Sequence, residues 1–244
     1  MHRIVKPARI LTWNLERTQP CRGRGAAAVD HLFSLAPDIA VLTETRTTFP
    51  RREGHTIWSE PPRTTRRNAD ERTVLAWSRE PWSDIDRLGA PDLDTSRFVA
   101  ATTETPVGPI RVLAVCIPWH MAEVTYPMGV KRRPWELHLD FLAILADMIA
   151  EVAVPTVVAG DFNQRIPRVR YGNHSAAAAL ATTFEPLEIV TSGTPGGASR
   201  PGIDHIALSG HLRAERVWGW PNEVGGRRLS DHDGAGVDVI GSRA

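Results

Sequence analysis

The 244-residue chain has 42% hydrophobic and 23% charged residues, a composition typical of a soluble globular protein. Its net charge of +1 excludes a strong global field toward a polyanionic partner, so any nucleic-acid surface must be a local patch. The two cysteines, Cys21 and Cys116, have neither metal-ligand spacing nor a disulfide framework. No apolar run approaches the roughly eighteen residues of a membrane span, and the N-terminus lacks the apolar core of a signal peptide. We therefore expect a soluble, cytoplasmic protein.

The first part of the chain predicts a strand, a helix and a second strand. Residues 8–14 form a strand that ends in Asn14, residues 24–36 have apolar side chains at helical spacing, and residues 39–42 form a buried strand that delivers Glu44. Asn14 is ordinary as a turn former and Glu44 as a surface charge. Oxygen ligands at the ends of neighbouring strands are, however, how a protein holds Mg²⁺.

The middle of the chain is first basic and then rich in strands. Residues 46–72 are irregular, interrupted only by residues 55–59, and contain a cluster of arginines that includes Arg66 and Arg67. Such a run forms either a solvated loop or a patch that contacts phosphates. The strands that follow are predicted at residues 73–78, 97–104 and 110–117. A loop rich in Pro and Asp joins the first two of them. Strands that follow one another without an intervening helix indicate antiparallel hairpins.

An amphipathic helix predicted over residues 135–152 leads into the most distinctive stretch, residues 154–164. A valine-rich run of strand length ends there in Gly160 and then delivers Asp161 and Asn163. A period-two backbone points both of these side chains the same way. A carboxylate beside a carboxamide suits a site that orients water against a phosphate. A strand that runs into an Asx turn has the same pattern.

The last third of the chain predicts a helix over residues 175–183 and then a set of strands at residues 202–208, 214–218 and 235–240. Asp204 lies near the start of the first of these strands, and Asp231 and His232 precede the last. A histidine beside a buried aspartate is held in one tautomer and favoured in its charged form. The sequence has no repeat, low-complexity tract or interdomain linker, so we predict one domain over residues 1–244.

Five blocks occur in order between residues 10 and 232: Trp13-Asn14, Thr43-Glu44, Gly160-Asp161-Phe162-Asn163, Ile203-Asp204-His205 and Ser230-Asp231-His232. In this order the chain resembles the endonuclease/exonuclease/phosphatase superfamily, which has the deoxyribonuclease I-like fold. The Gly-Asp-Phe-Asn and Ser-Asp-His blocks are the specific ones. The resemblance implies an α/β protein with a four-layered α/β/β/α sandwich, in which helices flank two packed mixed β-sheets.

The resemblance also implies a metal site and a catalytic group. Glu44 would be the principal metal carboxylate, helped by Asn14 and Asp231. Because these ligands are oxygen atoms with no cysteine nearby, the expected metal is Mg²⁺ or Mn²⁺.

The remaining residues of the resemblance act on the nucleophile and on the phosphate. Asp161 would hold or deprotonate the attacking water, and Asn163 would orient the phosphate. His232, supported by Asp204, would bond the phosphate oxygen that gains charge in the transition state. Phosphoryl transfer needs these parts, namely a cation, a positioned nucleophile and preorganised donors.

Two features depart from the family's pattern. Family members usually place a histidine or tyrosine in the strand before the long helix, where Cys116 stands here. His120 fills that role, oriented by Glu71, or it is an ordinary loop histidine. The abasic-site enzymes of the family resemble one another in a Trp-Arg-x-Asp-Tyr block, whereas residues 200–205 lack that tryptophan. This difference weakens an assignment to abasic-site repair.

From these residues we expect a monomeric, metal-dependent phosphoester hydrolase that acts on phosphodiester bonds in nucleic acid, with Arg66 and Arg67 as candidate substrate-binding residues. A phosphatase or phosphodiesterase for a small-molecule or lipid-headgroup phosphoester is the alternative. A binding module that keeps the fold without catalysis is a third possibility. The presence of Asp161 disfavours that module, since binding alone does not need a water-activating group.

Overall fold

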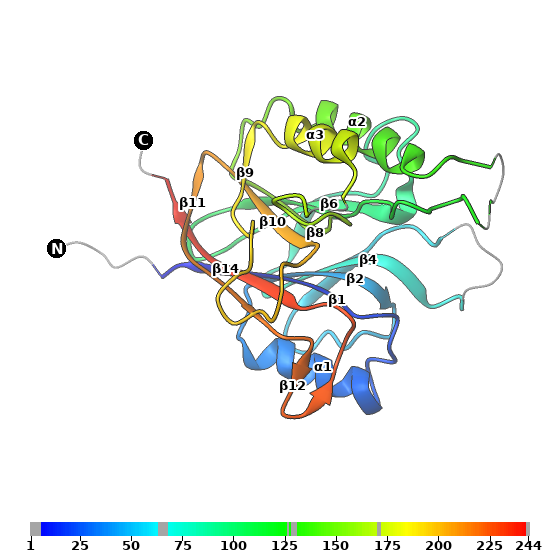
Figure 1. Cartoon of the computed structure of the whole chain (residues 1–244). Helices are drawn as coiled ribbons and strands as arrows, with labels where there is room; N and C mark the ends of the chain where they lie inside the picture. Colours follow the sequence, from blue (N-terminus) through cyan, green and yellow to red (C-terminus); the bar gives the residue numbers. More distant parts are fainter. Residues whose placement is uncertain (1–5, 63–67, 126, 128–130, 170–171, 243–244) are drawn as a thin grey trace.

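Two six-stranded β-sheets lie face to face in the part of the chain that the structure describes (Figure 1). The structure is a computed structural model, and it describes residues 6–62, 68–125, 127, 131–169 and 172–242. Arg66 and Arg67, the candidate substrate-binding residues, lie outside the described residues. Each sheet combines parallel and antiparallel pairs, as the predicted sandwich of mixed sheets requires.

The first sheet joins the two ends of the described chain. In spatial order its strands are β11 (Leu212–Trp220), β14 (Gly234–Gly241), β1 (Ala8–Asn14), β2 (Ile39–Arg46), β4 (Glu71–Ser78) and β3 (His55–Trp58). The central pair, β1 and β2, is parallel and is connected through helix α1 (Gly23–Ser34), so both strands end at the same edge of the sheet.

The second sheet is formed by the middle of the chain and by β10. In spatial order its strands are β5 (Trp82–Asp86), β6 (Phe98–Thr103), β7 (Ile110–Cys116), β8 (Thr156–Asp161), β10 (Asp204–Ser209) and β9 (Leu187–Ile189). Its parallel pair is β7 and β8, connected through helix α2 (Glu136–Ile149). β5 lies where the sequence predicted only a loop, because its residues are largely exposed at a sheet edge and show no hydrophobic alternation.

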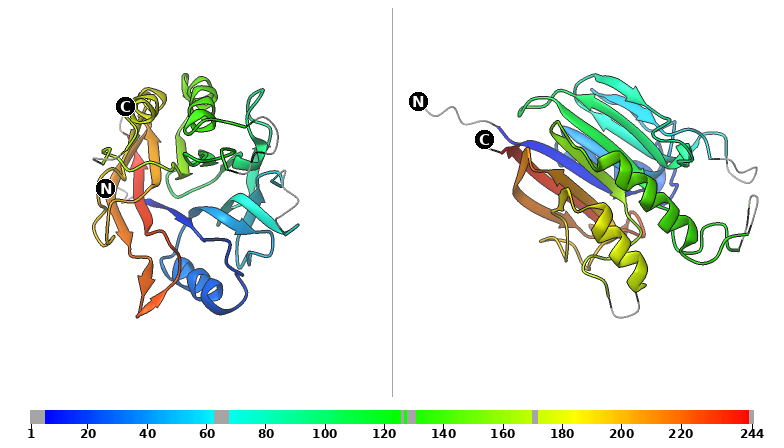
Figure 2. Two further views of the ribbon diagram at one scale, coloured as in Figure 1. Left: turned by 45° about the vertical axis from the view of Figure 1, so that its right-hand side comes forward. Right: turned by 90° about the horizontal axis from the view of Figure 1, so that it is seen from above.

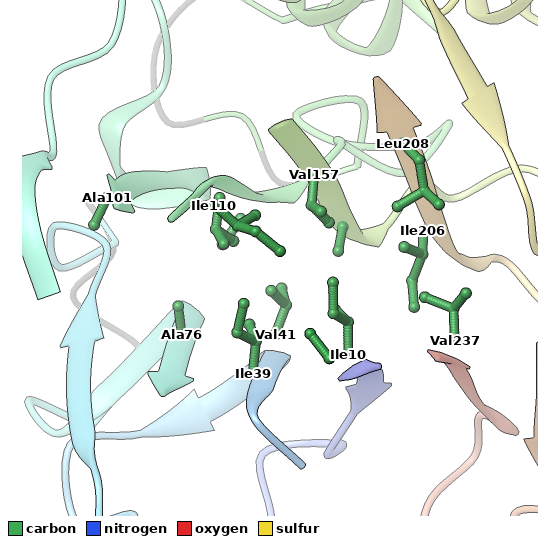
Figure 3. Packing of buried hydrophobic residues seen from close by; sticks show 14 of the residues in the cluster. Ile10, Ile39, Val41, Ala76, Ala101, Ile110, Val157, Ile206, Leu208 and Val237 are labelled. Atoms are coloured by element: carbon green, nitrogen blue, oxygen red, sulfur yellow. The ribbon is translucent and has the colours of Figure 1, made fainter. Parts of the chain in front are cut away.

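The space between the sheets is filled by the inward-facing residues of both. Ile10, Ile39 and Val41 of the first sheet point toward Ile110 and Val157 of the second (Figure 3). All five are at most 1% exposed, and burial of one such side chain stabilises the fold by about 1.5–3 kcal/mol. This shared apolar layer fixes the two sheets against each other.

The outer face of each sheet is covered by helices, which completes the four layers. α1 packs on the first sheet through a cluster that includes Leu32, Trp13 and Trp77. α2 and α3 (His174–Thr183) pack on the other sheet, so that the helices lie on opposite sides of the sandwich (Figures 1 and 2). The predicted α/β/β/α architecture is therefore confirmed. Within the described chain, no helix is long and apolar enough to cross a membrane.

The smaller elements lie outside these layers. A short hairpin of β12 (Glu223–Val224) and β13 (Arg227–Arg228) projects beside α1 (Figure 1). A 3₁₀ turn, Thr95–Arg97, leads directly into β6. Asp94 caps this turn by accepting a hydrogen bond from the backbone N–H of Ser96 at 3.1 Å, so the turn delivers Arg97 at a defined position at the start of β6.

Strand alternation and register together bring polar side chains to one end of the sandwich. The inward rows that contain Ile10, Val157 and Ile206 are apolar in the core. Four residues beyond Ile10 and Val157 these rows reach Asn14 and Asp161, and two residues before Ile206 they reach Asp204. Asp161 is the register partner of Asp204 on β10 and of Cys116 on β7. The polar ends of both sheets therefore meet at the same edge.

Candidate active site

A pocket of about 620 Å³ opens at this edge. Six of the predicted site residues line it, namely Asn14, Glu44, Asp161, Asn163, Asp231 and His232. The other lining residues are Arg17, Glu71, Thr73, Arg97, Cys116 and Trp119. Asp204 lies directly behind His232, so the structure brings together most of the residues that the sequence singled out.

Gly160 allows the strand that carries Asp161 to lie very close to its neighbour. Its φ is +138°, and a Cβ atom at this position would lie 1.8 Å from the carbonyl oxygen of Val115 on β7. Any other residue would push β7 and β8 apart. The glycine of the Gly-Asp-Phe-Asn block thus sets the position of the carboxylate that follows it.

Asp161 is buried in a network of hydrogen bonds. One carboxylate oxygen accepts from Asn14 Nδ2 at 3.2 Å, and the other accepts from the backbone N–H of Asn163 at 2.8 Å. The Asn163 carboxamide in turn donates to the carbonyl oxygen of Ile117 at 2.8 Å. The bond to Asn14 joins the two sheets, because Asn14 ends β1 and Asp161 ends β8.

Burial raises the pKa of Asp161 to about 7, with a further contribution from the negative charge of Asp204. At this pKa the carboxylate and the carboxylic acid are both populated near neutral pH. A group in that condition accepts and releases protons readily, which is the property expected of a general base.

His232 is held by a buried carboxylate. Its Nδ1 lies 2.5 Å from an Asp204 carboxylate oxygen, and Asp204 is 3% exposed. The loop is fixed in addition by Trp13 Nε1, which donates to the carbonyl oxygen of His232 at 2.8 Å, and by Ser230 Oγ, which donates to the carbonyl oxygen of Asn14 at 2.6 Å. The His232–Asp204 contact is a second link between the sheets, since these residues precede β14 and begin β10.

His232 is cationic around neutral pH. Burial by itself lowers its pKa, but the charge of Asp204 and the hydrogen bond to it, together with Asp161 and Asp231, raise the pKa to about 10. Because Nδ1 faces Asp204, the other ring nitrogen, Nε2, points toward the pocket and lies 4.0 Å from an Asp231 carboxylate oxygen. The imidazolium therefore presents a charged N–H donor to whatever the pocket binds.

Glu44 differs in one respect from the sequence prediction. The sequence placed it at the end of a strand, but β2 continues to Arg46, and Glu44 adopts a left-handed backbone conformation with φ of +48° inside the strand. A non-glycine residue in this region carries strain of about 1–3 kcal/mol. Its carboxylate is bound by both terminal nitrogens of Arg17, at 2.6 and 2.7 Å.

The predicted metal ligands form a set of hard oxygen donors. Glu44 and Asp231 contribute carboxylates and Asn14 an amide oxygen, and such donors suit Mg²⁺ or Mn²⁺ better than zinc. No group of three or more His, Cys, Asp or Glu side chains with metal-binding geometry occurs among the described residues. The predicted set fits a cation in its chemistry, and Arg17 already shows that the position of Glu44 accepts positive charge. A metal bound to Glu44 would share or displace that guanidinium.

His120 does not line the pocket with the other predicted residues. It is exposed, and its ring packs against Trp119 and Trp135 at centroid distances of 5.3 and 5.5 Å. No hydrogen bond between His120 and Glu71 is found among the described residues; one Glu71 carboxylate oxygen instead accepts hydrogen bonds from Arg46 and Asn68, both at 3.1 Å.

Cys116, which the resemblance aligns with a histidine or tyrosine of the family, is buried and has a cation beside it. Burial and the charge of Asp161 raise the pKa of the Cys116 thiol far above its ordinary value, so the thiol stays protonated. Arg97 donates from Nη1 to the carbonyl oxygen of Cys116 at 3.3 Å. The sequence reasoning missed Arg17, Arg97 and Trp119. Of these, Arg97 could have been found from hairpin register, since Phe98 pairs with Val115.

The geometry agrees with a comparison of the sequence against models of protein families. The model described as the Endonuclease/Exonuclease/phosphatase family matches residues 11–232, a range that includes every residue of the pocket. The chain belongs to this family. Its members are phosphoester hydrolases and generally use divalent metals.

Solved structures of this family have the same fold. An AP endonuclease from Archaeoglobus fulgidus superposes with a TM-score of 0.71 at 16% identity, covering 94% of this chain and 98% of that one. A Neisseria 3′ phosphatase bound to a product DNA hairpin has a TM-score of 0.67 at 19% identity, covering 95% and 98%. The human Nocturnin catalytic domain with bound sulfate has a TM-score of 0.66 at 18% identity, covering 97% and 94%. No curated protein sequence matches the chain.

Proposed function

We propose that the protein is a divalent-metal-dependent phosphoesterase that hydrolyses phosphodiester bonds, with nucleic acid as its substrate class. The observation that carries the proposal is that one group in the pocket is deprotonated and another is protonated at the same pH. Between pH 7 and pH 10, Asp161 is ionised while His232 is still protonated. A base and a cationic donor that face the same space are what hydrolysis of a phosphoester needs.

In the proposed reaction, Asp161 acts on the nucleophile. A water molecule donates one proton to the Asp161 carboxylate while its oxygen forms a bond to phosphorus. The ester P–O bond breaks, and the leaving oxygen departs with the electron pair and takes a proton from solvent. Asn14 and the backbone N–H of Asn163 hold the carboxylate in place. Because both are donors to Asp161, they fix the direction from which it accepts the proton.

His232 acts on the phosphate. Its Nε2–H donates to a non-bridging oxygen as negative charge grows on that oxygen, and Asp204 keeps the ring charged and correctly oriented. Arg97 is a second cation in the same pocket. The pocket therefore offers more than one cationic side chain to a phosphate.

The metal completes the proposed site. Glu44, Asn14 and Asp231 would hold Mg²⁺ or Mn²⁺, which when bound would offset the charge on the phosphate oxygens. We propose further that residues 1–244 work as one domain, because the two sheets share one core, and that the protein is monomeric and cytoplasmic. Size-exclusion chromatography and cell fractionation test the last two points.

Nucleic acid is favoured as the substrate by similarity and by charge. The AP endonuclease and the DNA-bound Neisseria phosphatase share the fold across nearly their whole length. Lys131 and Arg133 add cations that could follow a phosphate backbone, whereas Arg132 between them is paired with Glu136 and Asp140. A small-molecule phosphoester is the second candidate, since a pocket of about 620 Å³ is large enough to enclose a small ligand.

A screen of purified protein tests the proposal. DNA, RNA, inositol phosphates and sphingomyelin are each incubated with Mg²⁺ or Mn²⁺, and Asp161→Ala serves as the control. Hydrolysis of DNA or RNA that Asp161→Ala abolishes would support the proposal. Hydrolysis of only the small phosphoesters would select the second candidate, and activity that survives in Asp161→Ala would refute the assigned site.

A further inference from the structure

Trp119 is an exposed aromatic side chain at the rim of the candidate active site. It is 48% exposed and lines the pocket. The other large hydrophobic side chains that are exposed in the described chain, Ile85, Leu88, Val154 and Val169, do not line it. Exposure of a tryptophan ring to water is unfavourable, so its location beside the reactive groups needs an explanation.

The Trp119 ring is held by a row of aromatic rings that runs into the core. It packs edge-on against His120, His120 lies against Trp135 at 5.5 Å, and Trp135 packs edge-on against His138 at 5.0 Å. His138 is fully buried, and its Nδ1 lies 2.7 Å from the carbonyl oxygen of Pro118. The residue before Trp119 is thus anchored to α2.

Backbone hydrogen bonds fix the same segment from both sides. The N–H of Ala122 donates to the carbonyl oxygen of Trp119 at 2.9 Å, and the N–H of Trp135 donates to that of His120 at 2.7 Å. Asn163 in addition donates to the carbonyl oxygen of Ile117, which ties the segment to the strand end that carries Asp161. Trp119 therefore has a defined position relative to the reactive carboxylate.

The rest of the pocket wall has a different chemistry. Among the described lining residues, Trp119 is the only large apolar side chain; the others are mostly charged or hydrogen-bonding groups such as Arg97, Asp161 and His232. These groups suit a phosphate and the polar atoms around it, but they provide no large apolar surface on which a flat ring could pack. A substrate that used the whole pocket would combine a phosphate with an unsaturated ring.

We propose that Trp119 stacks on a nucleobase next to the scissile phosphate, so that the preferred substrate is single-stranded nucleic acid or a frayed end. This inference rests on the proposed function and narrows it. In an intact duplex both faces of a base are covered by its neighbours, whereas in a single strand a base can turn onto an aromatic side chain. Because every base has a π-face, such stacking gives little sequence preference.

The test compares matched oligonucleotides with matched variants. The substrates are a single-stranded oligonucleotide and copies in which a tetrahydrofuran residue replaces the nucleotide at one position at a time around the cleavage site. The enzymes are wild type, Trp119→Ala, Trp119→Phe and, as a control, Leu88→Ala, which alters a 71% exposed side chain away from the pocket. Steady-state kinetics give kcat and KM for each pair, and thermal unfolding checks that every variant is folded.

Trp119→Ala should raise KM on the base-bearing oligonucleotide by about ten-fold or more, with a smaller change in kcat. When tetrahydrofuran replaces the nucleotide whose base stacks on Trp119, the KM of wild type should rise by a similar factor. On that same oligonucleotide, Trp119→Ala should raise KM little further. Trp119→Phe should restore most of the loss, and Leu88→Ala should behave as wild type. A merely structural role would instead lower activity equally on all substrates.

Distinct results overturn the inference and the proposed function. If wild type cleaves the oligonucleotides but Trp119→Ala has the same effect with and without the base, the stacking is wrong and the hydrolase activity stands. A wild-type preference for duplex or for the tetrahydrofuran substrate would also refute it. If wild type hydrolyses small phosphoesters but no oligonucleotide, the nucleic-acid substrate and the stacking both fall.

Discussion

Replacement of Asp204 by asparagine should move the alkaline limit of activity by several pH units. The pKa of His232 is about 10, compared with an ordinary value of 6.5. At about 1.36 kcal/mol per pH unit, this difference corresponds to roughly 5 kcal/mol in favour of the imidazolium, and Asp204 is the largest of the groups that raise it. Without that carboxylate, burial still lowers the pKa while Asp161 and Asp231 still raise it, so the pKa of His232 should fall by several units toward its ordinary value of 6.5.

The size of the expected loss follows from these values. A histidine with a pKa of 6.5 is cationic in about 3% of molecules at pH 8, so kcat/KM of Asp204→Asn should fall roughly 30-fold at that pH from protonation alone. Wild type should instead show a bell-shaped profile that rises through about pH 7 as Asp161 ionises and falls near pH 10 as His232 loses its proton.

The assay measures kcat/KM between pH 5.5 and 10.5 with saturating Mg²⁺. Asp238→Asn is the matched control, because Asp238 is also a buried aspartate but pairs with Arg9, so this variant should lose stability without a change in the pH profile. In a His232→Ala background, Asp204→Asn should add little further loss, since the two residues act as a unit. An alkaline limb that stays near pH 10 in Asp204→Asn, or losses that multiply in the double variant, would refute the assigned pair.

Four further outcomes are expected. EDTA should abolish activity and Mg²⁺ or Mn²⁺ restore it; full activity of a metal-free preparation would contradict the metal site. Asp161→Asn should cost several orders of magnitude in kcat with little change in substrate binding. Because the pKa of Asp161 is raised, the folded protein loses stability as pH rises from 3.8 to about 7. Asp161→Asn should therefore increase the free energy of unfolding of the metal-free protein at pH 8, by at most about 4 kcal/mol, and raise its unfolding temperature. At pH 4 it should do neither. Replacement of Arg66 and Arg67 by glutamine should flatten the dependence of nucleic-acid binding on salt; an unchanged slope would favour the small-substrate candidate.

The sequence alone predicted those parts of the fold that depend on local pattern. The valine-rich run before Gly160 predicted β8 because its residues are buried on both faces, and alternation predicted that Asp161 follows it. The same approach missed β5, whose edge position leaves its side chains exposed. Short edge strands are stabilised by pairing with a neighbour, which is β6 here, and no local pattern reports that pairing.

The residues of the candidate site divide in the same way. Asn14, Asp161 and Asp204 could be predicted because each stands at a strand end in a recognisable block. Trp119 could not, since its place in the pocket depends on an aromatic row from α2, and Arg97 could be found only after the hairpin register that pairs Phe98 with Val115 had been worked out. His120 follows the strand by only four residues, but its ring packs against Trp119 and Trp135 and does not line the pocket.

The hydrogen bonds that cross between the sheets make the candidate site sensitive to mechanical change in the core. Asn14 reaches from the first sheet to Asp161 on the second, and His232 reaches in the same way to Asp204. Their lengths depend on the thickness of the apolar layer between the sheets, which Ile10 and Val157 help to set. Adding or removing one methyl group in this layer changes the spacing between the two sheets rather than the shape of one loop. A hydrogen bond weakens when its length increases by a few tenths of an ångström. Catalysis should therefore fail before the fold does, and substitutions in this buried apolar layer should change the rate while every residue that lines the pocket stays the same.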